Sequence, residues 1–176
     1  MLLSRDELIT TLFRETDRAQ RFKTALALIL CGIDGWKSWI AKVSEDTVRA
    51  ADEEIAERIA GVFRCCDLLG RYGDGEFALI LPGCNSFSAV GMAGRLRQEV
   101  FGSKFFSGSE AMLFEASFGV AGSGGRSPLV VLRNAENALI EARMRRPGPI
   151  VRSSYAAEPD PASFQMPVME DEVLPW

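Results

Sequence analysis

Hydrophobic and polar positions along the first half of the chain follow helical and strand periodicities in turn. Apolar residues recur at helical spacing between charged ones from Leu8 to Phe22, which predicts an amphipathic helix. Residues 24–33 are nearly all apolar, and so short an apolar run is typical of a strand buried on both faces. Ser44 is a suitable helix N-cap, and the apolar stripe over residues 48–62 predicts the helix that follows it.

The second half begins with a predicted hairpin. Gly73-Asp74-Gly75 lies between two short strand candidates, residues 67–72 and 76–81, and is a strong turn signal. The pattern then predicts three further elements: a helix capped by Ser86, a strand over residues 114–121, and a helix that starts at Ser127-Pro128. The order of helices and strands indicates an α/β or α+β fold with helices packed on a central sheet.

Composition narrows the function classes. The chain has 176 residues, of which 47% are hydrophobic and 25% are charged, so it supports one compact domain with a short tail. A net charge of −4 argues against nucleic acid or an anionic membrane as partner. No apolar run approaches the roughly 20 residues of a membrane span, and the N-terminus lacks the apolar core of a signal peptide. We therefore predict a cytoplasmic protein.

The chemistry-bearing side chains are restricted as well. There is no histidine, and the four cysteines form no CxxC pair, which argues against a zinc site and against any Ser-His or Cys-His nucleophile. Any catalysis would therefore depend on carboxylates and a bound metal.

The last 22 residues differ in composition from the rest. Residues 155–176 hold four prolines, a cluster of acids (Glu170, Asp171, Glu172) and no periodicity. We predict a domain over residues 1–154 and a mostly disordered, Pro-rich acidic tail over 155–176. The apolar residues of this tail favour a role in recognising a protein partner, and a tail folded back on its own domain is the alternative.

Four segments carry a resemblance to a known family. Residues 71–82 read RYGDGEFALILP, which resembles the signature hairpin RYGGDEF of GGDEF (diguanylate cyclase) domains. Residues 33–37 (IDGWK) look like the family segment DxDxFK without its first Asp, residues 117–121 (SFGVA) match SxGxA, and residues 135–143 look like ADxALYxAK. The resemblance spans residues 5–150 in the family's order. It implies a palm-like fold with a mixed sheet surrounded by helices.

The resemblance also implies an activity and shows why this chain departs from it. Family members join two GTP molecules by attack of a ribose hydroxyl on an α-phosphate, a reaction that needs divalent metal. The two metal-binding carboxylates of the family correspond to Gly32 and Gly75, which have no side-chain oxygen. Asp74 is one position early and is expected to face the other way, and Asp34 is displaced by about 6–7 Å along the strand. We predict no enzyme activity and no magnesium cofactor.

The other nucleotide-binding positions are altered too. The guanine-reading Asn and Asp of the family correspond to Ile40 and Arg49. Lys37 and Arg143 keep the positive charge of two phosphate contacts but are interpreted first as solvated surface charges, and Pro147 replaces an arginine. The degenerate signature itself occupies Gly73, Asp74, Gly75, Glu76 and Phe77.

A regulatory motif of the family is retained. Arg64-Cys65-Cys66-Asp67 matches its RxxD motif, and Arg95 corresponds to a second arginine of the same site, which in the family binds an intercalated dimer of cyclic di-GMP. Arginine can donate two bonds to O6 and N7 of guanine, and a carboxylate can accept from N1 and N2. A surface ion pair between Arg64 and Asp67, or a motif inherited without use, is the alternative. Cys65 and Cys66 are expected to be strand residues.

The sequence thus predicts a catalytically inactive receptor for cyclic di-GMP that uses Arg64, Asp67 and Arg95. The ligand is expected to be its small-molecule partner, with a possible ligand-bridged dimer and further protein partners. The alternative is a nucleotide-independent interaction module of a signalling pathway, and a third option is an active cyclase.

Overall fold

Local sequence signals set most helix boundaries in the computed structural model, which describes residues 2–107, 110–145 and 150–153. Helix α1 (Arg5–Phe22) begins after Ser4 with a capping box, in which Ser4 and Glu7 exchange hydrogen bonds that lower the pKa of Glu7. Helix α3 (Glu45–Gly61) follows the predicted cap Ser44. Helix α4 (Ser86–Glu99) is capped by Asn85, so the prediction of Ser86 was wrong by one residue.

Two further helices complete the set in the described part of the chain. Helix α5 (Pro128–Met144) starts with proline at its first position, as predicted. Helix α2 (Trp36–Ile40) was not predicted, because five residues are too few to show a periodicity.

The strands form one mixed sheet in the order β1-β3-β4-β2-β7-β8. Its strands are β1 (Leu2–Leu3), β2 (Leu26–Ile33), β3 (Leu68–Gly73), β4 (Glu76–Pro82), β7 (Ala116–Gly122) and β8 (Ile150–Arg152). Central strand β2 pairs antiparallel with β4 and β7, while the two edge strands pair parallel with their neighbours. Every residue of β2 is buried, as the unbroken apolar run predicts.

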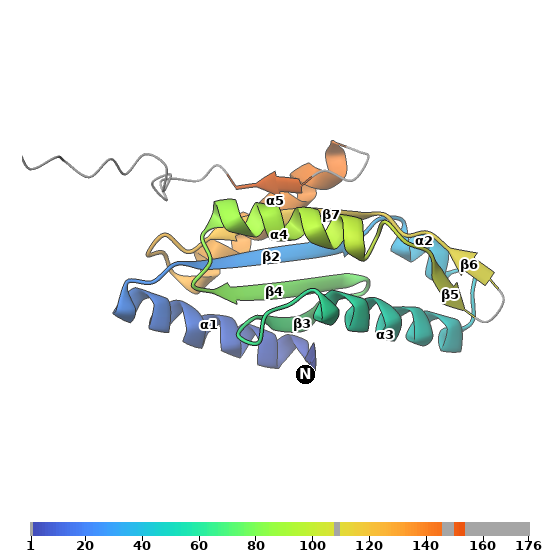
Figure 1. Cartoon of the computed structure of the whole chain (residues 1–176), viewed down its shortest axis with the longest axis horizontal. Helices are drawn as coiled ribbons and strands as arrows, with labels where there is room; N and C mark the ends of the chain where they lie inside the picture. Colours follow the sequence, from blue (N-terminus) through green and yellow to red (C-terminus); the bar gives the residue numbers. More distant parts are fainter. Residues whose placement is uncertain (1, 108–109, 146–149, 154–176) are drawn as a thin grey trace, which may run out of the picture.

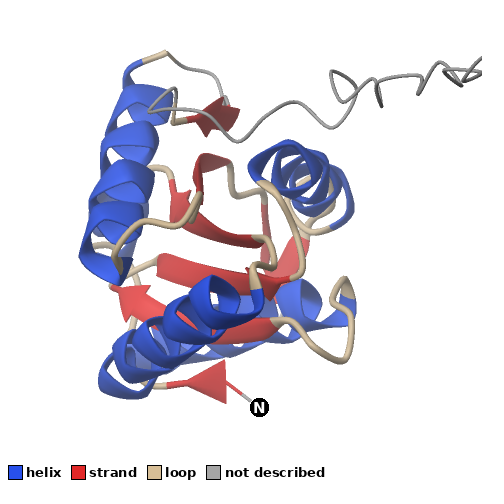
Figure 2. Cartoon of the chain, turned by 90° about the vertical axis from the view of Figure 1, so that its left-hand side faces the viewer, coloured by secondary structure: helices blue, strands red, loops and turns tan. Residues whose placement is uncertain are grey.

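Helices cover both faces of this sheet (Figures 1 and 2). On one face, Leu28 and Leu30 of β2 pack with residues of α1 and α5. On the other face, Ile29 and Cys31 pack with residues of α3 and α4. The predicted class, a central mixed sheet surrounded by helices, is confirmed.

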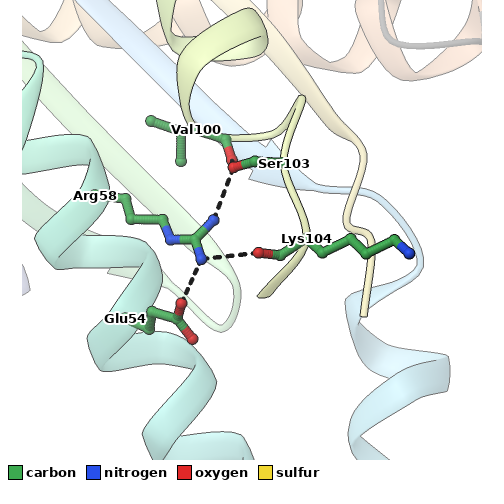
Figure 3. A network of polar contacts seen from close by, with 5 residues as sticks. All are labelled: Glu54, Arg58, Val100, Ser103 and Lys104. Atoms are coloured by element: carbon green, nitrogen blue, oxygen red, sulfur yellow. Dashed lines mark hydrogen bonds and ion pairs between the residues drawn. The ribbon is translucent and has the colours of Figure 1, made fainter. Parts of the chain in front are cut away.

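A small hairpin that the sequence did not reveal is fastened to α3. Strands β5 (Phe105–Ser107) and β6 (Glu110–Met112) pair outside the main sheet. The guanidinium of Arg58 donates to the Ser103 hydroxyl at 2.9 Å and to the Lys104 carbonyl at 2.8 Å (Figure 3). It also lies 4.0 Å from the centre of the Phe105 ring. Phe105 in turn contacts an aromatic cluster of Phe114, Trp36 and Trp39, of which Trp36 lines the site described below.

The predicted disorder of residues 155–176 lies outside the described residues, so the division at residue 154 stays a prediction. Among the helices that the structure describes, none combines the length and the apolar character needed to cross a membrane.

Candidate functional site

The degenerate signature lies where the end of β2 meets the β3–β4 turn. In the sheet, Gly32 is paired with Glu76 on β4 and with Ser117 on β7. The guanidinium of Arg143 reaches over from α5 and donates to Oε1 of Glu76 at 2.8 Å. A Cβ placed on Gly32 would overlap this guanidinium. A protein cation therefore occupies the space in front of Gly32.

Gly75 is constrained by both its backbone and its neighbour. Its φ of +66° lies in the left-handed region that favours glycine. A Cβ at this position would also overlap the indole of Trp36, which is buried in the aromatic cluster with Trp39 and Phe114. The absence of a carboxylate at Gly75 is therefore built into the local packing.

The nearby carboxylates are arranged differently from the prediction. Asp74 lies in the turn between β3 and β4, not on a strand, and it lines the clefts on both sides of that turn. The prediction placed Asp74 on a strand, and this premise was wrong, because strand alternation does not apply to a turn. Asp34 accepts hydrogen bonds from the Ser117 hydroxyl at 2.9 and 3.1 Å.

These carboxylates share a cleft of about 290 Å³ with two cations. Asp34, Asp74 and Glu76 line it together with Lys37 and Arg143. Because Arg143 is bound to Glu76 and fills the space over Gly32, these donors do not fit a divalent metal, which needs several converging oxygens. No metal-binding cluster of His, Cys, Asp or Glu is found among the described residues.

Two groups beside the site are held in their neutral forms. Complete burial raises the pKa of the Cys31 thiol, and the charge of Asp34 adds to this effect. Burial, together with a hydrogen bond to Glu136, raises the pKa of Tyr72 to about 12. Neither group is ionised near neutral pH, so neither supplies a nucleophile or a base there.

The position of the predicted guanine pocket is a cleft of about 660 Å³ that is lined by both apolar and charged residues. Trp36, Ile40 and Val48 are among its walls. Arg49 also lines it, but its guanidinium is paired with Asp46 at 2.5 Å on the same helix. The cleft thus offers an alkyl group and a paired cation at the two positions that would read guanine.

The RxxD residues converge on a different cavity, of about 340 Å³. Arg64 and Asp67 line it from the segment between α3 and β3, and Arg95 lines it from α4. The backbone N–H of Arg64 donates to the Asp67 carboxylate at 2.9 Å, and that of Asp67 donates to the Arg64 carbonyl at 3.1 Å. These two bonds close a tight turn, and the turn places both residues in the lining of the cavity.

The same turn carries Cys65 and Cys66, which are exposed. The expectation that they are strand residues was wrong, because β3 starts only at Leu68. The reciprocal bonds between Arg64 and Asp67 replace strand pairing over these residues.

The arginines of this cavity differ in how they are held. With the residues that the structure describes, the Arg64 guanidinium makes no hydrogen bond or ion pair, so the alternative of an Arg64–Asp67 ion pair is not observed. Arg95 donates to the Val62 carbonyl at 3.3 Å and lies 3.7 Å from Glu99, with half of its side chain exposed.

Sequence reasoning missed two contacts that shape the site. Trp36 packs against Gly75, and Arg143 lies over Gly32. Both contacts bring together residues that are far apart in the sequence. The sequence indicates these two contacts only indirectly, because Gly32 and Gly75 stand where the family has carboxylate side chains.

Comparison with known proteins identifies the family of the fold. The family described as "Diguanylate cyclase, GGDEF domain" matches residues 1–147. The response regulator PleD of Caulobacter vibrioides is 30% identical over 122 residues, which are 67% of this chain and 27% of PleD. The chain thus spans about a quarter of the length of this curated relative.

Solved structures share the fold. The GGDEF domain of DgcB from Caulobacter crescentus, in complex with c-di-GMP, has a TM-score of 0.80 and 23% identity, over 86% of this chain and 91% of that chain. Diguanylate cyclase SiaD from Pseudomonas aeruginosa, in complex with its activator SiaC, has a TM-score of 0.80 and 28% identity, over 86% of this chain and 58% of that chain.

Proposed function

Because the chain belongs to the diguanylate cyclase (GGDEF) domain family, we propose that it is a non-catalytic member that binds cyclic di-GMP as a cytoplasmic receptor. Arg64, Asp67 and Arg95 would hold the ligand. The observation that carries the proposal is that Arg95 of α4 lines the same cavity as Arg64 and Asp67, which precede it by about 30 residues in the sequence.

The loss of catalysis is supported by the edge of the sheet where metal would bind. Gly32 and Gly75 provide no side-chain oxygen ligands, and the guanidinium of Arg143 lies beside Glu76, where it would compete with a divalent cation. A fixed monovalent guanidinium neutralises charge, but it offers no site at which a ribose hydroxyl can be deprotonated. The alkyl side chain of Ile40, in place of an amide, adds a second obstacle, since a buried guanine group without a partner costs about 1–3 kcal/mol.

The receptor role is supported by the chemistry of the RxxD cavity. An arginine that is not engaged with described protein groups can give both guanidinium edges to guanine or phosphate. The carboxylate of Asp67 accepts one backbone N–H and retains further acceptor capacity for the guanine N1 and N2 donors. A GGDEF domain of the same fold, from DgcB, is known in complex with c-di-GMP.

We expect no conversion of GTP to cyclic di-GMP with either magnesium or manganese, measured by chromatography of the products. The paired variant Gly32→Asp/Gly75→Asp should also give little product, because Ile40 and Arg49 still line the base cleft. An active family member assayed in parallel controls for the conditions. Product formation by this chain, abolished by a chelator and free of contaminating cyclase, would contradict the proposal.

Titration calorimetry with cyclic di-GMP separates the receptor from a nucleotide-independent interaction module. The module remains the second candidate because Phe106 of β5 and Leu113, which directly follows β6, are each 63% exposed. In addition, SiaD, which shares the fold, is known in complex with its activator SiaC. Saturable heat with cyclic di-GMP favours the receptor, and its absence favours the module. Size-exclusion chromatography with ligand tests whether the complex is a ligand-bridged dimer.

A further inference from the structure

A second cavity, of about 600 Å³, adjoins the RxxD cavity and is lined from α1 by Arg14 and Arg18. The two cavities share Cys66, Pro82 and Gly83, so they meet at the turn that carries the RxxD motif. The linings of the two cavities together contain two acidic residues, Glu15 and Asp67. They contain four arginines: Arg14, Arg18, Arg64 and Arg95. We call these four residues the arginine cluster.

The cluster is accessible and has an apolar floor. The side chains of Arg14 and Arg18 are 71% and 69% exposed and lie 3.6 and 3.8 Å from Glu15, so these ion pairs are loose. Leu68 and Met92 line the two cavities, and the side chain of Phe22 is 65% exposed at the rim. Such a surface suits an occupant that combines carboxylates with apolar side chains.

The described fold ends close to this surface. The backbone N–H of Ser153 donates to the Val120 carbonyl, which continues the pairing of β8 with β7. The guanidinium of Arg152 lies 3.4 Å from the Ser86 hydroxyl and 4.1 Å from the centre of the Phe87 ring, at the start of α4. Ser88, two residues further on, already lines the RxxD cavity. Figure 1 shows β8 and β4 ending at the same left-hand side of the sheet.

The sequence that follows has the complementary chemistry. Residues 155–176 contain five acidic residues and no Lys or Arg, while residues 1–154 contain 20 basic and 19 acidic residues. The apolar residues of the segment include Phe164, Met166, Val168 and Trp176. An extended chain covers about 3.3 Å per residue, so the 17 steps from Ser153 to Glu170 span up to about 55 Å. The three strand spacings from β8 to β4 amount to about 15 Å.

We propose that residues 155–176 dock on the arginine cluster of their own chain and thereby compete with the ligand of the RxxD cavity. Carboxylates of the segment pair with the guanidinium groups, and its apolar side chains cover the floor of the two cavities. The tether keeps the local concentration of the segment in the millimolar range, so weak contacts suffice. The identity of the competing ligand rests on the proposed function, while the docking itself does not.

Cys65 and Cys66 report on docking without any ligand. Both are exposed in the turn between the cavities, whereas Cys31 is buried and serves as an unlabelled reference. We expect maleimide to label these two thiols about five- to tenfold faster in the variant Glu170→Gln/Asp171→Asn/Glu172→Gln than in the natural chain. A segment that is docked for about 80–90% of the time would slow labelling of the natural chain by this factor. Peptide mass spectrometry locates the label, and 0.5 M NaCl should remove most of the difference.

A matched variant, Glu53→Gln/Glu57→Gln/Glu115→Gln, removes three exposed acids from residues 1–154 instead. Unchanged labelling in this control is expected, since it leaves the segment intact. Equal acceleration in both variants would assign the effect to net charge and overturn the proposal. Protection that rises with protein concentration would overturn it as well, because the segment would then bind a second copy of the chain.

Cyclic di-GMP titration gives an independent second readout. The tail variant should bind about five- to tenfold more tightly than the natural chain, by the same occupancy argument. Equal affinities together with thiol protection would show docking without competition and overturn the competitive part. If neither protein binds cyclic di-GMP while protection persists, the proposed receptor function fails and docking stands.

Discussion

We expect Arg64→Ala to weaken cyclic di-GMP binding about ten- to a hundredfold, which corresponds to the loss of one bidentate arginine–guanine contact worth about 1–3 kcal/mol. The Arg64 guanidinium has no partner among the described residues, so its removal leaves no described carboxylate unpaired. Isothermal titration calorimetry at fixed salt measures the affinity. Arg64→Lys, which keeps the charge but not the planar fork, should recover only part of the loss.

Three further variants make this prediction specific to the cavity. Arg97→Ala removes an exposed arginine from the same helix as Arg95 but outside the cavity lining, and should leave affinity unchanged. Arg95→Ala should weaken binding less than Arg64→Ala. Asp67→Asn is preferable to Asp67→Ala, because the amide oxygen can still accept from the Arg64 N–H and keep the turn closed. Equal affinity of Arg64→Ala and the natural chain would show that the ligand binds elsewhere.

The elements that could be predicted from the sequence are those with local signals. An eight-residue apolar run defines β2, a capping box starts α1, and a glycine-flanked turn joins β3 to β4. The convergence of Arg64, Asp67 and Arg95 could also be anticipated, because the spacing of the resemblance places them on neighbouring elements.

The elements that could not be predicted depend on contacts between distant parts of the chain. The β5–β6 hairpin has two strands of three residues each, and it is held by Arg58 of α3 through bonds to Ser103 and Lys104. Likewise, Arg143 covers Gly32 only because α5 packs along β2. Periodicity in a single segment contains no information on such pairs.

Gly75 and Trp36 show the same dependence at the site itself. The resemblance places Trp36 where the family has phenylalanine and Gly75 where it has aspartate. In the structure, the first ring atoms of the indole fill the space that a side chain at residue 75 would need. The ring of residue 36, in the position that it takes here, and a side chain at residue 75 therefore exclude each other, and restoring the carboxylate alone cannot restore the site.

We therefore expect Gly75→Asp to lower the free energy of unfolding by about 2–5 kcal/mol. The positive φ contributes about 1–2 kcal/mol, and the overlap with a packed ring that cannot rotate away adds about 1–3 kcal/mol. Gly125→Asp is the matched control, because its φ of +75° is similar but a Cβ there meets no atom within 4 Å. It should cost only the backbone part, about 1–2 kcal/mol.

Urea denaturation of a double-mutant cycle tests the coupling directly. Trp36→Ala removes the ring atoms that a side chain at residue 75 would overlap, so Gly75→Asp should cost at least about 1 kcal/mol less in the Trp36→Ala background than in the natural chain. The same background should leave the cost of Gly125→Asp unchanged. If Gly75→Asp costs no more than Gly125→Asp in the natural chain, then backbone strain alone determines the effect, and the indole is not what excludes a carboxylate from this position.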